Sequence, residues 1–232
     1  MLLIETLVED RSGSVIMDQV LRKMIAAQPY PWTHHVYAHR GSGNFPRDPR
    51  EKPQLGESAL LPLLGAKLRA YRKALRESTT LLIVVVMDTD DQPRESLFDK
   101  LYEISRVEAE TVPTIVGLAT EEMEAWMLGD RQAILTAYPD ADEGVLDDYE
   151  QDSVCGTWEV LCHSILREQA PRLIEIGYPA VGQYKFEWAR RIAYHMDLEH
   201  NQSPSFRRFH SDLRSALLTN GVQGGNFDLS IS

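Results

Sequence analysis

The feature that most limits the fold is the unbroken apolar run Leu81–Met87, which reads LLIVVVM. A strand-length run rich in β-branched residues, without alternating polar positions, is typical of a strand buried on both faces. Such a strand lies inside a parallel sheet that helices cover on both sides. The run ends directly in Asp88-Thr89-Asp90-Asp91. We therefore predict an α/β fold with carboxylates at the end of its central strand.

Strand-like and helix-like segments alternate around this run. Apolar segments of strand length, and segments with apolar residues at helical spacing, follow each other in order. Strand followed by helix, repeated four times, predicts a parallel sheet flanked by helices. The other strands are expected at 2–8, 34–39 and 112–119, and the helices at 14–27, 60–75, 94–107 and 121–138, with a Gly- and Pro-rich loop at 41–56.

The chain after Tyr138 has no strand-like segment. It reads as an acidic loop, then three helices, then a glycine-rich end that we expect to fray. We predict an α/β domain over residues 1–138 and a helical C-terminal extension packed on it over residues 139–232. The three helices are expected at 157–169, 184–196 and 206–218.

The composition restricts the partners. At 43% hydrophobic and 25% charged residues the chain is an ordinary globular protein. A net charge of −11 argues against a general nucleic-acid coat protein. The charge is unevenly spread, however. Residues 67–76 include five basic and no acidic residues, and residues 138–152 include seven acidic and no basic residues. An enzyme acting on nucleic acid therefore stays possible, although we favour a solvated helix face for the basic residues Lys67, Arg69, Arg72, Lys73 and Arg76.

No sequence feature indicates a membrane or an oxidising compartment. No stretch approaches the ~18–20 apolar residues that cross a bilayer. The apolar start is broken by Glu5 and Glu9 and has no basic leader, so we do not read it as a signal peptide. We expect a soluble cytoplasmic protein with no membrane partner. Cys155 and Cys162 are too few for a disulfide framework, and we expect two buried thiols on one helix.

Acidic residues follow two of the predicted strands. Glu9 follows the first, and Asp88 and Asp90 follow the third. In an open α/β sheet ligands bind beyond the carboxyl ends of the strands. Carboxylates gathered there repel unless a cation neutralises them, and hard oxygen ligands favour Mg²⁺ or Mn²⁺. The sequence therefore predicts a metal site formed by these three residues.

These acids also fit three alternatives to such a metal site. Acids after a strand can cap the next helix, an alternative that is strongest for Asp91. A DxD motif also occurs in haloacid-dehalogenase-like phosphatases and in nucleotide-sugar glycosyltransferases. The first would need the motif on an earlier strand and a different residue from Gln92, and the second usually needs a longer chain.

The acidic motifs resemble those of the Toprim superfamily, shared by topoisomerases, primases and overcoming-lysogenization-defect (OLD) nucleases. That superfamily carries a Glu after its first strand and a DxD after its third. Leu7-Val8-Glu9-Asp10 resembles the first motif, and Met87-Asp88-Thr89-Asp90 resembles the second. The family pattern has Gly after the Glu, whereas this chain has Asp10, which leaves the turn less backbone freedom.

Three further stretches resemble one branch, the DUF4276 family of Toprim-like phage-defence proteins. Residues 39–43 resemble its HRGxG loop, residues 122–130 its EMEAWLLAD helix, and residues 201–206 its NxSPSF segment. The resemblance implies a Toprim-like sheet and a nuclease-like site with Mg²⁺ or Mn²⁺ on Glu9, Asp88 and Asp90. It also implies genes encoded beside an AAA-type ATPase, in abortive-infection systems such as AbiL.

The same helix carries Glu122 and Glu124, which match the acids of the family motif. On a helix, side chains two positions apart point about 200° away from each other, so one of them at most could reach the metal. We favour Glu122 as a catalytic residue that binds a second ion or orients water. The alternative is a helix-dipole role for both acids. For Trp126 we favour core packing over base stacking.

Four basic residues are candidates for substrate contact or charge stabilisation. Arg40 offers a guanidinium to phosphate from the glycine-rich loop. Lys185, Arg207 and Arg208 could hold the scissile strand or stabilise developing charge, with a solvated surface as the alternative for each. None of the tyrosines has a context that supports a topoisomerase-like covalent step.

Two hypotheses follow. The first is a Mg²⁺-dependent endonuclease, acting on DNA or RNA, with Glu9, Asp88, Asp90, Glu122 and Lys185 at its centre. The second is a non-catalytic Toprim-shaped subunit that docks on an AAA-type ATPase and regulates it. Acidic net charge and Asp10 favour the second modestly.

Overall fold

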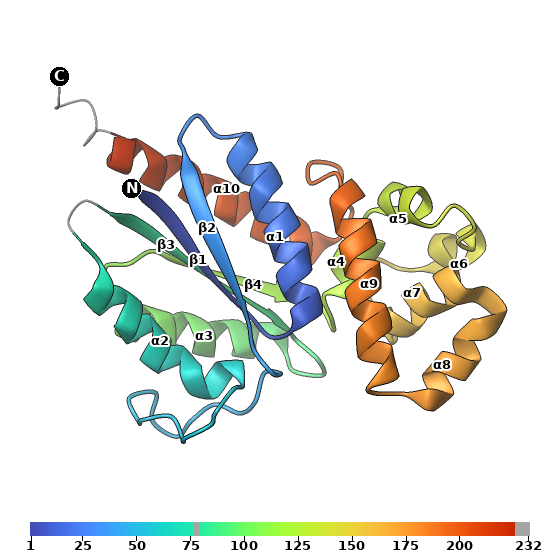
Figure 1. Ribbon diagram of the computed structural model, residues 1–232, viewed down its shortest axis with the longest axis horizontal. Helices are drawn as coiled ribbons and strands as arrows, with labels where there is room; N and C mark the ends of the chain where they lie inside the picture. Colours follow the sequence, from blue (N-terminus) through green and yellow to red (C-terminus); the bar gives the residue numbers. More distant parts are fainter. Residues whose placement is uncertain (77–78, 226–232) are drawn as a thin grey trace.

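The computed structural model describes residues 1–76 and 79–225. Its centre is a four-stranded sheet, all parallel, in the order β2-β1-β3-β4 (Figure 1). The α/β fold with a parallel sheet is confirmed. The strands are β1 (Leu2–Val8), β2 (Trp32–Ala38), β3 (Thr80–Asp88) and β4 (Thr114–Ala119).

The central position of β3 agrees with its sequence. β3 lies between β1 and β4, and every residue from Leu81 to Met87 is buried. β2 lies at the edge of the sheet, where exposed and less exposed residues mostly alternate. An edge strand with one covered face requires apolar side chains only on that face, which explains its weaker apolar pattern.

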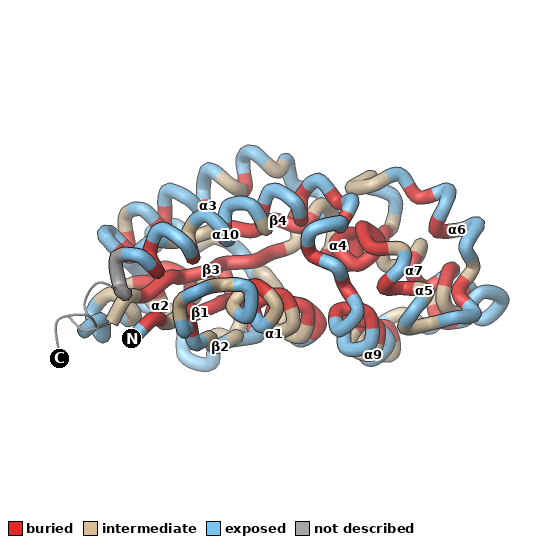
Figure 2. Tube along the Cα trace, turned by 90° about the horizontal axis from the view of Figure 1, so that it is seen from above, coloured by how far each residue is buried: buried red, intermediate tan, exposed pale blue. Residues whose placement is uncertain are grey.

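Helices cover both faces of the sheet. On one face, α1 (Arg11–Ala26) and α10 (Pro204–Gly225) pack against Ile4, Val84 and neighbouring side chains. On the other face, α2 (Leu60–Ala74) and α3 (Arg94–Glu108) enclose a second apolar cluster around Ile83 and Val85. Seen from above, red, buried strand segments are visible between α1 and α10, the two helices that cover this face (Figure 2).

The remaining helices form a lobe beyond the carboxyl ends of the strands (Figure 1). The carboxyl edge of the sheet therefore faces this lobe, and α9 connects the two because it packs along α1. The lobe comprises α4 (Glu124–Leu128), α5 (Arg131–Ala137), α6 (Glu143–Asp148), α7 (Thr157–Leu166), the 3₁₀ helix η1 (Arg167–Gln169), α8 (Ala170–Ile176) and α9 (Ala180–His195).

The last helix returns from this lobe to the sheet. α10 packs on β3 and β4, and it extends to Gly225, beyond the predicted end at Leu218. The glycine-rich tail that we expected to fray falls outside the described residues from position 226 onward. The division at residue 138 stays a prediction, although α10 shares the core of the sheet.

The helix predicted over 121–138 is wrong as one element. It breaks into α4 and α5 at Gly129 and Asp130. Asp130 leaves the helical conformation and accepts hydrogen bonds from the backbone N–H groups of Ala133 at 2.9 Å and of Asp197 at 2.6 Å. This N-cap begins a new helix, and the bond to Asp197 depends on a segment far along the chain.

Two further expectations are corrected. The acidic loop contains α6, whose N-cap Asp142 accepts hydrogen bonds from Gly144 and Val145. Cys155 is exposed and precedes α7, so only Cys162 is the buried helical thiol that we expected of both. No helix within the described residues is long and apolar enough to cross a membrane.

Candidate functional site

The carboxyl ends of β1 and β3 bring two predicted residues together. β1 and β3 are neighbours in register, with Val8 beside Val86. Glu9 directly follows β1 and Asp88 is the last residue of β3, so the two residues lie at the same edge of the sheet. The backbone N–H of Asp88 donates a hydrogen bond to Glu9 Oε2 at 3.4 Å. The Oδ1 atom of Asp88 is shielded from solvent and has no hydrogen-bond partner among the described residues. The expected carboxylate pair therefore exists at the carboxyl edge of the sheet.

Asp90 lies at the rim of this pair. It is exposed and has a φ of 46°, and its backbone N–H donates to the carbonyl of Glu121 at 2.9 Å. Thr89 Oγ1 accepts a hydrogen bond from the Glu121 N–H at 2.8 Å, which fixes the loop from the other side. Burial raises the pKa of Glu9, and the charge of Asp90 is close enough to raise it further.

The acids after β3 do not cap the next helix. α3 begins after Pro93, and no side chain accepts a hydrogen bond from its first turn. Asp88, Asp90 and Asp91 therefore do not serve as its N-cap, and their position needs another reason.

Two further carboxylates reach the same edge from the α4 segment. Glu122 lies in the turn before α4, whereas Glu124 begins the helix. The argument from helical spacing therefore fails, because only one of the two residues is helical. Both carboxylates approach the ammonium of Lys185 from α9, Glu122 Oε1 at 3.2 Å and Glu124 Oε2 at 3.2 Å.

Glu124 is more deeply placed than the favoured Glu122. Its side chain is 1% exposed, against 20% for Glu122, and its Oε1 has no hydrogen-bond partner in residues 1–76 and 79–225. Burial raises the pKa of Asp88 well above its usual value, and the charges of Glu9 and Glu124 raise it further. Glu124 is thus the acid of this motif that borders Asp88, and residue spacing in the sequence did not reveal it.

Lys185 remains a cation in this setting. Burial alone would lower its pKa, but the charges of Glu124, Glu122 and Asp88 raise it well above the usual value. The lysine is 5% exposed, so its ammonium offsets part of the buried negative charge. The sequence predicted Lys185 as a site residue, and the structure brings it to the carboxylates.

The carboxylates outnumber this cation. Burial and the neighbouring charges of Asp90 and Asp10 raise the pKa of Glu9 to about 7. Burial also raises the pKa of Glu124 to about 7, even though Lys185 lowers it. Carboxyl groups with raised pKa values and buried oxygens without partners are what a divalent cation would satisfy. The residues present therefore fit a Mg²⁺ or Mn²⁺ ion with oxygen ligands.

The carboxylates of the described residues do not form a complete set of metal ligands. Across residues 1–76 and 79–225, no three His, Cys, Asp or Glu side chains already converge as a metal-binding group. Glu9 and Asp88 provide the pair, and Asp90 and Glu124 are the acids whose charges act on Glu9 and Asp88 respectively.

Asp10, where the Toprim motif that the sequence resembles has glycine, is not strained. Its φ of −144° is extended, so the glycine's conformational freedom is unnecessary here. Its Oδ1 accepts a hydrogen bond from the Gly13 N–H at 2.7 Å and its Oδ2 one from the Ser12 hydroxyl at 2.5 Å. Asp10 therefore caps α1 and adds negative charge beside Glu9.

The HRGSG loop supports the backbone of Glu9. His39 Nδ1 lies 2.7 Å from the carbonyl of Val8, and the N–H of Gly41 donates to the carbonyl of Glu9 at 3.0 Å. Gly41 has a φ of +84°, which glycine adopts at little cost. Arg40 is exposed in this loop, close in sequence to the residues that hold Glu9.

The other predicted arginines lie on α10. Arg207 and Arg208 are both exposed. Burial lowers the pKa of Arg94, and the charge of Arg208 lowers it further. Arg94 begins α3, so Arg208 lies beside the segment that follows β3 and the DTDD sequence. The structure thus brings Arg208 towards this edge but gives it no direct contact with Glu9 or Asp88 in the described residues.

The EMEAW and NxSPSF segments interlock behind the site. Trp126 is fully buried and donates its indole N–H to Ser205 Oγ at 3.0 Å. Its ring stacks on Phe209 with centroids 5.0 Å apart, and its carbonyl accepts a hydrogen bond from Asn201 at 2.8 Å. The interpretation of Trp126 as core packing is confirmed. These contacts position α4, and through it Glu124, against the sheet.

Fold and site together define a class of protein. It is an α/β protein with an all-parallel sheet and buried carboxylates gathered at the carboxyl ends of two neighbouring strands. The chain belongs to the DUF4276 family, a domain of unknown function whose family model matches residues 8–214. The match includes every candidate site residue. Comparison with curated proteins and with solved structures gave no match.

Proposed function

We propose that the chain is a metal-dependent, Toprim-like nuclease that hydrolyses phosphodiester bonds of DNA or RNA. The observation that carries the proposal is the Glu9–Asp88 pair, held by neighbouring strands at the edge where open α/β sheets bind ligands. Glu9, Asp88 and Asp90 would hold Mg²⁺ or Mn²⁺, with Glu122 or Glu124 as a further acid. A bound divalent ion polarises phosphate oxygens and lowers the pKa of water.

The chain's own side chains divide the remaining work. Lys185 stays protonated and would stabilise negative charge that develops on the phosphate. Glu122 lies at the more open side of Lys185, where it would orient a water molecule. Arg40 and the pair Arg207 and Arg208 are exposed at or near this edge and would contact the phosphates on either side of the scissile bond.

The setting that we propose is cytoplasmic anti-phage defence. The support is family membership together with the resemblance of the motifs to abortive-infection proteins. An AAA-type ATPase encoded nearby would be the partner, and its presence would control when the nuclease acts.

One observation favours a non-catalytic alternative. Lys185 already supplies a cation to Glu122 and Glu124, so that half of the cluster is neutralised without a metal ion. A Toprim-shaped subunit that only docks on an ATPase and regulates it would need no more than this. Metal affinity separates the two functions, because only the nuclease requires the Glu9–Asp88 pair to bind an ion.

The test is cleavage of a panel of DNA and RNA substrates with Mg²⁺ or Mn²⁺. Wild type is compared with the Asp88→Ala/Asp90→Ala double variant. The matched control is Asp91→Asn, an exposed acid in the same loop. Cleavage that requires metal, is lost in the double variant and persists in the control supports the nuclease. A folded chain without cleavage or metal binding supports the docking subunit.

A further inference from the structure

An exposed aromatic ring borders the acidic cluster. Tyr178 lies in the turn between α8 and α9 and is 65% exposed. Its ring packs against Gly182, where an added Cβ would lie 3.7 Å from Tyr178 Cε1. The ring is therefore held along the first turn of α9, with most of its surface open to solvent.

The geometry of α9 places this ring next to Lys185. Gly182 and Lys185 are three residues apart and share one face of the helix. The effect of charge agrees with this position. Burial raises the pKa of Tyr178, whereas the ammonium of Lys185 lowers it, and Glu122 and Glu124 raise it again. Tyr178 is thus an open ring at the border of the site and is not part of the protein core.

A cation and a second ring lie at Phe186, the residue after Lys185. The guanidinium of Arg11 sits over the ring of Phe186, 5.0 Å from its centroid. Arg11 is exposed and follows Asp10 at the start of α1. Stacking on an aromatic ring fixes a guanidinium without consuming its hydrogen-bond donors. Arg11 can therefore still bind a phosphate.

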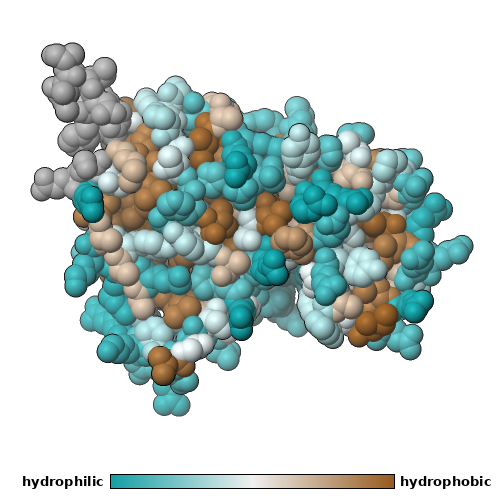
Figure 3. Space-filling view, in the orientation of Figure 1, coloured by the Kyte–Doolittle hydropathy of each residue, from teal (hydrophilic) through white to brown (hydrophobic). Residues whose placement is uncertain are grey.

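Both features lie towards the N-terminal ends of two packed helices. α1 and α9 run side by side in the same direction, and Arg11 at the start of α1 meets Phe186 in the second turn of α9 (Figure 1). The surface is hollowed between the sheet lobe and the helical lobe near these turns (Figure 3). Tyr178 lies just before α9 and near Lys185, and Arg11 begins α1 and lies on Phe186, the neighbour of Lys185 in the sequence.

We propose that the site takes a single-stranded nucleic acid, with a base stacked on Tyr178 and a phosphate bound by Arg11. This inference rests on the proposed function for its choice of nucleic acid. Stacking on aromatic rings is sequence-tolerant and contributes about 1–3 kcal/mol per base. A duplex hides its base faces inside the helical stack, so it cannot use the Tyr178 ring without flipping a base out. The strand would pass over Lys185 and the carboxylates between the two contacts.

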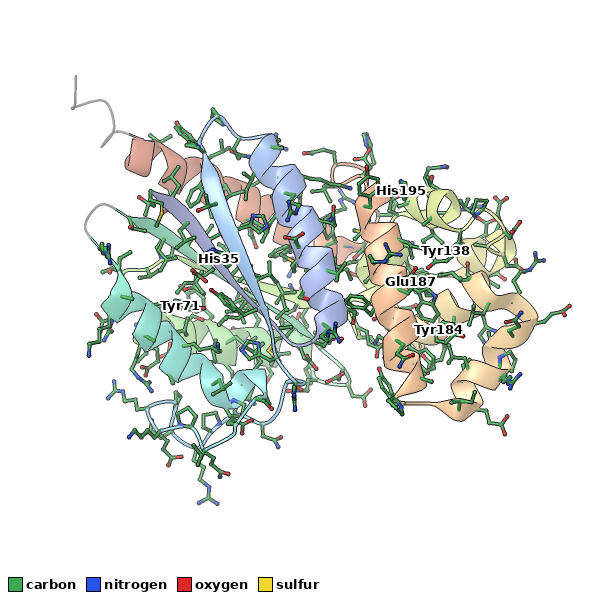
Figure 4. All side chains as sticks on the ribbon, in the orientation of Figure 1. His35, Tyr71, Tyr138, Tyr184, Glu187 and His195 are labelled. Atoms are coloured by element: carbon green, nitrogen blue, oxygen red, sulfur yellow. The ribbon has the colours of Figure 1, made fainter. Side chains whose placement is uncertain are left out.

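The experiment measures binding separately from cleavage. Fluorescence anisotropy with Ca²⁺ in place of Mg²⁺ follows single-stranded DNA, single-stranded RNA and duplex DNA of about a dozen nucleotides, a length in the range of known single-strand sites. The variants are Tyr178→Ala and Tyr178→Phe. The control is Tyr194→Ala, which is 66% exposed and lies beside His195 at the opposite end of α9 (Figure 4).

We expect both single strands, or the one that is the substrate, to bind more tightly than duplex. Tyr178→Ala should weaken single-strand binding roughly 5- to 100-fold, while Tyr178→Phe and Tyr194→Ala stay within about 2-fold of wild type. Arg11→Gln should weaken binding and reduce its salt dependence. Circular dichroism checks that each variant is folded, as exposed positions predict.

Duplex bound as tightly as single strands, or a folded Tyr178→Ala variant that binds like wild type, overturns the inference. Failure of the nuclease proposal looks different: single-strand binding that depends on Tyr178 persists, but no substrate is cleaved. Metal-dependent duplex cleavage that Tyr178→Ala does not change would uphold the nuclease and sink this inference.

Discussion

The backbone N–H of Asp88 donates a hydrogen bond to the Glu9 carboxylate across 79 positions of the chain. The bond exists because β1 and β3 are parallel neighbours, so both chains leave the sheet at the same edge. It places the Glu9 carboxylate beside Asp88, the first residue of the acidic segment 88–91, in a partly buried position. Two ionised carboxylates this close repel each other, which lowers the stability of the metal-free protein.

Removing one carboxylate of the pair should stabilise the metal-free protein. Asp88→Asn keeps the shape of the side chain and removes a buried carboxyl group whose ionisation Glu9 and Glu124 oppose. We expect the free energy of unfolding in EDTA to rise by about 1 kcal/mol or more. Urea denaturation measures it, with Asp91→Asn as the control expected to change little. A less stable Asp88→Asn chain would show that the aspartate serves the fold and not a metal.

Neutralising Lys185 should have the opposite effect. Lys185→Met leaves Glu124 buried without a counter-charge, which typically costs about 3–5 kcal/mol. Adding Glu124→Gln to Lys185→Met should recover most of this loss, because the buried charge is then absent. A double-mutant cycle by urea denaturation gives the coupling energy. Coupling near zero would mean that the lysine and Glu124 do not form a buried ion pair.

The stability of the metal-free protein should depend on pH through Glu9. The pKa of Glu9 is raised from 4.5 to about 7 in the folded chain, so the folded state binds this proton more tightly than the unfolded state. Its contribution is fully present below pH 4.5 and is lost as pH rises through about 7. The Glu9→Gln variant should therefore gain on wild type as pH rises, by roughly 1–2 kcal/mol at pH 8 after solvent screening.

Thermal unfolding in EDTA between pH 5 and pH 8 measures this difference. Mg²⁺ should reduce it, because the ion stabilises the ionised carboxylate only in wild type. A gap between Glu9→Gln and wild type that stays constant across this range would contradict the raised pKa.

The break between α4 and α5 should tolerate no side chain at Gly129. A Cβ there would collide with the side chain of Asn201 and with the backbone of Ser203, 2.8 Å away. We expect Gly129→Ala to destabilise the protein by about 1–3 kcal/mol. Gly182→Ala is the matched control, since an added Cβ has room in the first turn of α9 and the change should be neutral or slightly stabilising. Equal effects at both positions, measured by thermal unfolding, would contradict the packing of the NxSPSF segment on α4.

The sheet and the first pair of acids could be predicted from sequence because both depend on local rules. A buried run such as Leu81–Met87 indicates a central parallel strand, and parallel neighbours end at one edge. Glu9 and Asp88 follow directly from these two facts.

The partnership of Glu124 with Lys185 could not be derived in the same way. It depends on where the predicted helix 121–138 breaks, and the break is fixed by Asp130 bonding to the backbone of Asp197. The rim residues Arg11 and Tyr178 were missed for the same reason. The contact of Arg11 with Phe186 depends on α9 packing along α1, which residue spacing does not encode.

The central claim is that the acidic edge is a metal centre, and calorimetric titration with Mn²⁺ tests it most directly. Wild type should bind the ion, and the folded Asp88→Asn variant should lose at least about 10-fold in affinity. Asp91→Asn should bind like wild type. Wild-type protein that releases no heat with Mn²⁺ and gains no thermal stability from it would contradict the account and point to the docking subunit.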